Sequence, residues 1–271
     1  MNKLISRIRR LFLGYEFSRL PEIVEKLETL QSTNKRLEAK VTRLEDLLTL
    51  AGHQPKVLWI YANRSERMDA NLPFFEKGRC EFHLERYRFA SRYLKDRVVA
   101  DIACGTGYGA ALMRKDGQAS RVIGVDIDKD AVAYASDVYG QEDIAFVCAS
   151  ADASTLDASS VDVVTSFETL EHLENEQGLL SEFARILRPG GQLIISTPNQ
   201  WPCETHPHHV REYDRSSFCA ALGTHFVVRE LYNQNSGGSA KFNRGQAQGI
   251  VTTTDQNHGS AECFIAVCEK V

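Results

Sequence analysis

The stretch "DIACGTGYGA" at residues 101–110 decides the fold of this chain. Three glycines, Gly105, Gly107 and Gly109, follow a short apolar run, and Asp101 stands four residues before the first of them. A loop of this kind leads from a buried strand into a helix and lets a ligand lie against bare backbone. The residues around the loop indicate which ligand that is.

The chain beyond this loop alternates between apolar runs and helical patterns. Strands are expected at residues 97–103, 121–127, 144–150, 161–170, 190–199, 226–234 and 263–271. Strands that alternate with helices form right-handed βαβ units, which predicts an α/β fold with a doubly wound, mostly parallel sheet. The last two strands have no helix between them, so they should pair antiparallel. We therefore expect a seven-stranded sheet whose last strand is antiparallel.

Acidic residues beside the loop favour a cationic ligand. A dinucleotide-binding loop reads G-x-G-x-x-G, whereas the spacing here is G-x-G-x-G. Asp126 ends the second expected strand, where a carboxylate can accept both hydroxyls of a ribose. Asp101, Asp126 and Asp152 should stand around one crevice at the carboxyl ends of neighbouring strands. These charges disfavour a pyrophosphate and favour a positively charged nucleoside, so S-adenosylmethionine fits better than NAD.

Several stretches resemble the successive motifs of class I S-adenosylmethionine-dependent methyltransferases, which implies a Rossmann-like fold. They are "VVADIACGTGYGA", "VIGVDID", "ASAD", "SFETLEHL" and "LRPGGQLIISTPN", within residues 98–200. The flanking "HLERYRFA" and "HPHHVREYDRSSF" resemble a narrower group, the methyltransferases of bacterial cell-surface polysaccharide biosynthesis. Some members of that group cap the O-antigen chains of lipopolysaccharide, and some join the catalytic domain to a coiled coil and a membrane-associating segment.

The resemblance to the methyltransferases implies roles for the residues of the glycine loop. The backbone of Gly105 and Gly107 would lie against the methionine part of S-adenosyl-L-methionine, with Asp101 near its amino group. Asp126 would accept the ribose hydroxyls. These four residues are the centre of the expected cofactor site.

The resemblance also implies contacts at both ends of the cofactor. Ile127 would pack on the adenine, and Asp152 with Ala153 would receive its amino edge. Arg86 and Tyr87 precede the first strand and would reach the methionine carboxylate. The alternative for Arg86 and Tyr87 is a helix surface packed against the sheet.

Two histidine-containing loops are the expected catalytic region. Methyl transfer to a hydroxyl requires an aligned acceptor and a base, and histidine is the usual base near neutral pH. "ETLEH" brings Glu171 and His172 to the end of the fourth strand, and "HPHHVREY" brings His209 after the fifth. We expect His172 or His209 to act as the base, with His172 preferred; the alternative for His172 is a structural hydrogen bond to backbone. A divalent metal held by these histidines and glutamates is the alternative, but their spacing matches no metal signature, so no metal is expected.

The first 18 residues form a basic amphipathic pattern. Leu4, Ile8 and Leu11 fall on one helical stripe, with Lys3 and Arg7 on the other side. A short helix of this kind can lie on a membrane surface that contains anionic lipids. The alternative is packing against protein.

Residues 19–50 show a heptad pattern. With Leu20 at position a, eight of the nine a and d positions are aliphatic and the ninth is Asn34. So narrow a stripe predicts a parallel coiled coil, most simply a homodimer, with a trimer as the alternative. A helix lying on the globular domain is the other interpretation. Residues 51–80 are then a linker, and residues 81–271 the methyltransferase domain.

Composition limits the cellular setting. Hydrophobic residues at 43% and charged residues at 25% are ordinary for a globular protein, and the net charge of −4 gives no general attraction to nucleic acid. Seven scattered cysteines without a C-x-x-C pair fit a reducing cytoplasm. The polar, glycine-rich residues 234–257 are either part of the acceptor wall or disordered.

The resulting functional hypothesis is methylation of a sugar hydroxyl on a bacterial surface glycan or its lipid-linked precursor. The alternatives are methylation of a small molecule of quinone or polyketide type, and an inactive scaffold with a methyltransferase fold. The expected location is the cytoplasm, peripheral to the inner face of the cell membrane if residues 1–18 bind lipid.

Overall fold

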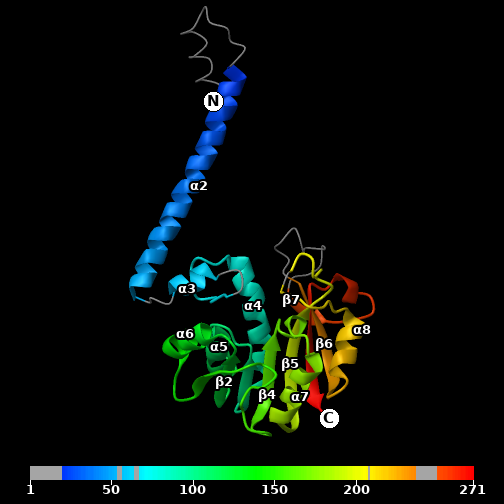
Figure 1. The fold of residues 1–271 in the computed structure, drawn as a ribbon. Coiled ribbons are helices and arrows are strands. Elements are labelled where there is room, and N and C mark those ends of the chain that lie inside the picture. The colour runs from blue at the N-terminus through cyan, green and yellow to red at the C-terminus, as the bar shows by residue number, and fades with distance from the viewer. Residues whose placement is uncertain (1–19, 54–56, 64–66, 207, 236–248) are drawn as a thin grey trace, which may run out of the picture. The chain divides into compact units, whose positions relative to one another are not determined.

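The computed structural model describes residues 20–53, 57–63, 67–206, 208–235 and 249–271. The chain divides into two compact units, residues 1–59 and residues 60–271. The second unit carries the sheet (Figure 1). It begins at Ile60, so much of the segment expected to be a linker between residues 51 and 80 belongs to this unit.

The first unit contains one long helix. Helix α2 runs without a break from Leu20 to His53, as the heptad pattern predicts for residues 19–50. Five of its seam residues are between 48% and 64% exposed in the single chain, namely Leu27, Leu30, Leu37, Val41 and Leu44. The coiled coil that would cover them stays a prediction. Residues 1–18 lie outside the described residues, and no helix in the described part of the chain is long and apolar enough to span a bilayer.

The second unit is built on one sheet of eight strands. The strands are β1 (Val98–Ile102), β2 (Arg121–Asp126), β3 (Ile144–Cys148), β4 (Val161–Phe167), β5 (Leu187–Pro198), β6 (Phe226–Asn235), β7 (Gly249–Thr252) and β8 (Cys263–Lys270). Their order is β3-β2-β1-β4-β5-β8-β6-β7. Strands β1 to β5 are parallel, and β8 lies antiparallel between β5 and β6.

The antiparallel last strand is therefore confirmed, whereas the expected count of seven strands is wrong. Strand β7 pairs antiparallel with β6 at the edge of the sheet. It lies inside residues 234–257, which the sequence predicts to be a loop. Its four residues, "GIVT", are too short a run to stand out from their polar surroundings.

Helices cover both faces of this sheet. The helices besides α2 are α3 (Val57–Ala62), α4 (Lys77–Ala90), α5 (Tyr108–Lys115), α6 (Lys129–Tyr139), α7 (Glu176–Ile186) and α8 (Arg215–Leu222). Successive side chains of a strand point to opposite faces. Val163 packs in the core cluster that includes α4 and α5, and Val164 packs in the cluster that includes α7 and α8. The result is the doubly wound arrangement that the sequence predicts.

The glycine loop connects β1 to α5 as expected. Gly107 caps α5 with a φ of 84°, a left-handed conformation that glycine adopts without strain. A Cβ there would also stand 2.7 Å from the Cβ of Ala135 and 2.7 Å from the ring of Phe146. Only glycine lets the loop turn this tightly against α6 and β3.

Candidate active site

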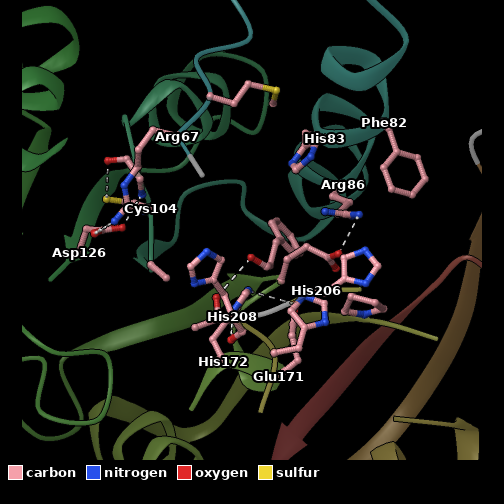
Figure 2. Close-up of a pocket in the computed structure, with 18 of the residues that line it drawn as sticks. Arg67, Phe82, His83, Arg86, Cys104, Asp126, Glu171, His172, His206 and His208 are labelled. Atoms are coloured by element: carbon pink, nitrogen blue, oxygen red, sulfur yellow. Dashed lines mark hydrogen bonds and ion pairs between the residues drawn. The ribbon is translucent and has the colours of Figure 1, made fainter. Parts of the chain in front are cut away.

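A cavity of about 980 Å³ opens at the carboxyl ends of the parallel strands. Its walls come from the loops after β1 to β5 and from residues 67–87, which precede the sheet. Asp126 and Cys104 lie toward one end, and Glu171 and three labelled histidines gather toward the other (Figure 2). In an open α/β sheet this edge is where ligands bind.

Asp126 is a buried carboxylate that lines the first end of the cavity. Its side chain is 4% exposed, and its Oδ2 accepts a hydrogen bond of 2.8 Å from the backbone N–H of Gly105. Its Oδ1 accepts another of 3.0 Å from the N–H of Asp128. Each carboxylate oxygen has a further lone pair, so Asp126 can still accept bonds from a ligand.

The glycine loop leaves room beside Asp126. Gly105 has a φ of 56°, and a Cβ added there would meet no described atom within 4 Å. Both Gly105 and Asp126 line the cavity. Backbone and carboxylate together therefore present the surface that a ribose and its attached chain require.

Asp101 is buried at the end of β1 and is 1% exposed. Its Oδ1 accepts a hydrogen bond of 2.8 Å from Thr165, and its Oδ2 one of 3.4 Å from the hydroxyl of Tyr87. Burial raises the pKa of Asp101 to about 7, and the nearby charge of Asp126 adds to the effect. A cation bound beside Asp101 would reverse that shift.

Arg86 lies inside the protein at 1% exposure and also lines the cavity. Its Nε donates to Gln234 at 2.6 Å, and its Nη2 lies 3.4 Å from Oε2 of Glu168. Its Nη1 is buried without a hydrogen-bond partner among the described residues. A buried guanidinium with an unused donor fits the carboxylate of an amino-acid ligand.

Of the three residues expected around the adenine, one lines the cavity and two do not. Ile127 lines the cavity and is 70% exposed, so its side chain is available to pack on a ring. Asp152 and Ala153 are exposed in the loop after β3 and do not line the cavity. Ser150 and Ala151 line it in their place, because the loop turns away after residue 151.

The three expected catalytic residues meet at the other end. Glu171 and His172 belong to a short 3-10 turn, η3 (Leu170–His172), directly after β4. Their ligating atoms and that of His209 all lie within 4.8 Å of one another. The loop that carries His209 is held there because the N–H of Val210 donates to the carbonyl of Glu171 at 2.9 Å.

The pKa values of Glu171 and His209 are shifted in opposite directions. Glu171 is 1% exposed, and its burial, together with the charge of Glu168, raises its pKa well above the usual range. Burial and the neighbouring charges of His172 and His206 lower the pKa of His209 to about 4. His209 is therefore a neutral imidazole at physiological pH.

Several cavity residues have no signal in the sequence. Arg67 lies 3.3 Å from Oδ2 of Asp128 and 3.8 Å from Oδ1 of Asp126, and the carbonyl of Met68 accepts a bond of 2.6 Å from Thr106. His83 lines the cavity from α4. Arg67 and Met68 belong to no motif, and His83 begins the stretch "HLERYRFA" but has no role that the sequence predicts, so only the folded chain shows their place in the cavity.

Comparison with known proteins agrees with this geometry. Residues 100–195 match the family described as the methyltransferase domain. A probable S-adenosylmethionine-dependent methyltransferase of Mycolicibacterium smegmatis is 37% identical over 134 residues, which cover 47% of this chain and 51% of the relative. A ubiquinone biosynthesis O-methyltransferase of Coxiella burnetii is 32% identical over 109 residues, covering 40% of this chain and 46% of the relative. The chain spans about half the length of the curated relatives it matches.

Solved structures share the fold. A Haloferax volcanii methyltransferase, determined in a complex with the Trm112 methyltransferase activator, has a TM-score of 0.58 at 20% identity over 71% of this chain and 91% of its own. The [4+2]-cyclase SpnF has a TM-score of 0.55 at 15% identity over 75% of this chain and 84% of its own. Because a cyclase shares the architecture, the fold alone does not define the reaction.

The fold and the site define an α/β domain whose cavity combines a glycine loop with a buried carboxylate. Over residues 100–195 the chain matches the methyltransferase domain family, and the fold and site are consistent with that match. S-adenosyl-L-methionine is the cofactor that the names of the sequence relatives imply. The open backbone at Gly105, the carboxylate of Asp126 and the unused donor of Arg86 fit that cofactor.

Proposed function

We propose that this chain is an O-methyltransferase that methylates a hydroxyl of an acceptor bound at the histidine-lined end of the cavity. The observation that carries the proposal is the division of one cavity into two ends. Asp126 and Gly105 line one end, and Glu171, His172 and His209 line the other. A cofactor held at the first end would present its methionine part toward the second.

The cofactor supplies a methyl group that is already activated on a sulfonium, so the protein mainly has to bind, align and deprotonate. Asp126 would accept the ribose hydroxyls, and Nη1 of Arg86 would donate to the methionine carboxylate. Asp101 would face the ammonium group, helped by the hydroxyl of Tyr87. Each contact would hold one group of the cofactor.

His172 is oriented to take a proton. Its Nδ1 lies 2.9 Å from the carbonyl oxygen of His208, which can only accept, so Nδ1 carries the hydrogen. The Nε2 of the neutral ring therefore keeps a lone pair. His209 is the second candidate, although its lowered pKa makes it a weak base.

For the acceptor, we propose a sugar hydroxyl of a bacterial surface glycan or of its lipid-linked precursor. Support comes from the resemblance of the stretches before and after the motif region to glycan methyltransferases. Trp201 lines the acceptor end and offers an aromatic face on which a sugar ring can pack. A quinone-type phenol is the second candidate, favoured by the relative named for ubiquinone biosynthesis O-methylation.

The test is methyl transfer from labelled S-adenosylmethionine to two acceptor sets, lipid-linked saccharides and catechol-type quinone precursors. We expect label in the saccharide fraction and none in the same reaction with Asp126→Ala. Label in the phenols alone would select the second candidate. If the protein binds the cofactor but transfers label to neither set, the proposed acceptor classes are wrong.

We also propose that α2 forms a parallel homodimer, with a trimer as the alternative. The exposed seam of α2, including Leu30 and Leu37, supports this because apolar side chains at heptad spacing are stabilised by a second copy. Asn34 donates to Glu38 at 2.9 Å within the single helix. In a dimer it would pair with its symmetry mate. Residues 1–18 of each copy would then meet at one end and strengthen contact with an anionic membrane surface.

A further inference from the structure

Glu171, His172 and His209 form a group with the composition of a metal site. Among the described residues it is a cluster in which three ligating side chains lie within 4.8 Å of one another. Two imidazoles and one carboxylate are the protein ligands of many catalytic zinc sites and of the facial triad that binds iron. In both kinds of site, three protein ligands leave coordination positions open for a substrate.

Glu171 carries an oxygen with no hydrogen-bond donor. Its Oε2 accepts a bond of 3.1 Å from the hydroxyl of Thr197, whereas its Oε1 has no hydrogen-bond partner among the described residues. Nε2 of His172 is 3.8 Å from that oxygen, which is too long for a hydrogen bond. Leaving a carboxylate oxygen buried and unpaired is costly, and a cation beside it would remove the cost.

The two histidines are oriented to complete the group. Nδ1 of His172 lies 2.9 Å from the carbonyl oxygen of His208, so Nδ1 carries the hydrogen and Nε2, 3.8 Å from Oε1 of Glu171, keeps a lone pair for a ligand. Metal-binding histidines typically have their second ring nitrogen held by a carbonyl or carboxylate in this way. His209 packs against His172 with ring centroids 4.8 Å apart, and its other side is stacked on His206.

We propose that Glu171, His172 and His209 bind one divalent transition-metal ion at the acceptor end of the cavity. Bonds of about 2.0–2.2 Å to nitrogen and oxygen place the ligand atoms roughly 3–3.5 Å apart. The group therefore has to contract by about 1 Å, which side-chain rotation of the two half-buried histidines can supply. The sequence did not predict this site, because its ligands come from two loops with no metal-binding spacing.

This inference rests on the proposed O-methylation and gives it a way to activate the acceptor. An ion beside an acceptor hydroxyl lowers the pKa of that hydroxyl, so its proton leaves to solvent near neutral pH. The oxygen then forms a bond to the methyl carbon as the carbon–sulfur bond breaks, and the electron pair of that bond stays on sulfur. Under this proposal His172 and His209 hold the ion, so solvent takes the proton in place of His172.

The test is direct metal binding by the full-length protein after removal of bound ions with a chelator. We expect calorimetric titration with Zn²⁺ to show one site per chain, and titration with Co²⁺ to produce visible absorption bands of a nitrogen- and oxygen-coordinated ion. Glu171→Gln and His209→Ala should each weaken Zn²⁺ binding at least 100-fold, since even second-shell changes at such sites cost 10–100-fold. His225→Ala removes a histidine outside the cavity and is the matched control, which should bind Zn²⁺ as the unaltered protein does.

Binding of S-adenosylmethionine is measured for each variant as well, because it distinguishes loss of the metal site from loss of folding. A variant that binds the cofactor normally is folded, so its loss of Zn²⁺ binding supports the site. The proposal is overturned if the unaltered protein binds the cofactor but no stoichiometric Zn²⁺ or Co²⁺. It is equally overturned if Glu171→Gln and His209→Ala bind Zn²⁺ as tightly as His225→Ala. If the unaltered protein does not bind S-adenosylmethionine, that result contradicts the proposed function and not the metal site.

Discussion

Replacing Asp126 with alanine should weaken cofactor binding. The carboxylate is 4% exposed and already accepts hydrogen bonds from the N–H groups of Gly105 and Asp128. Its remaining lone pairs would accept hydrogen bonds from the two ribose hydroxyls of S-adenosylmethionine. Asp126→Ala removes all four interactions.

The expected loss of affinity follows from the two ribose bonds. Hydrogen bonds to a charged group contribute about 1.5–3 kcal/mol each, so the lower value for both gives about 3 kcal/mol, or roughly 100-fold in affinity. Water that enters the vacated space and bonds to the ribose would offset part of this loss. The affinity should therefore fall at least tenfold.

Calorimetric titration with S-adenosylmethionine measures this loss, and Asp128→Ala is the matched control. Asp128 contacts the same Arg67 and caps α6 by accepting from the N–H of Asp130 at 2.9 Å, but it does not line the cavity. Its replacement should cost about 1 kcal/mol of stability and leave the affinity nearly unchanged. Unaltered affinity in Asp126→Ala, or equal losses in both variants, would refute the role given to Asp126.

Three further predictions concern charge, packing and assembly. Because burial raises the pKa of Asp101 to about 7, the free protein holds a proton there below pH 7. Calorimetry should therefore show cofactor affinity falling by roughly tenfold per pH unit below 7, and a pH-independent affinity would contradict this. A Cβ at Gly109 would stand 2.1 Å from the Tyr87 ring, so Gly109→Ala should lower the free energy of unfolding by about 1–3 kcal/mol in denaturant titrations; an unchanged value would refute that contact. Light scattering should find full-length chains oligomeric and chains without residues 1–50 monomeric, with Asn34→Leu raising the melting temperature of the oligomer. A monomeric full-length protein at micromolar concentration would exclude the coiled coil.

The part of the fold that could be predicted is the part with strong periodicity. Apolar runs such as residues 121–127 are long enough to read as buried strands, and Gly107 is required by a conformation that other residues adopt at a cost. Strand β7 was missed because its pairing with β6 comes from tertiary contact and not from its own composition. The same reason explains the domain boundary, since Arg67 and Met68 join the second unit only through contacts with distant residues.

In the candidate site, too, some positions could be predicted from the sequence and others could not. Residues at strand ends, such as Asp126 and Glu171, could be placed because the carboxyl ends of parallel strands share one edge. The path of a loop depends on its packing, and so Asp152 leaves the cavity while Ser150 stays in it. The unpaired oxygen of Glu171 could not be predicted either, because hydrogen-bond satisfaction depends on positions that only the folded chain fixes.

The proposed function requires one cavity to hold the cofactor with its reactive centre directed at the histidine group. A crystal structure of the protein with bound S-adenosylhomocysteine would show whether it does. We expect the ribose hydroxyls on Asp126, the amino-acid carboxylate at Arg86, and the sulfur on the side of Glu171, His172 and His209. A cofactor bound in the reverse direction, or with its sulfur shielded from these three residues, would refute this placement.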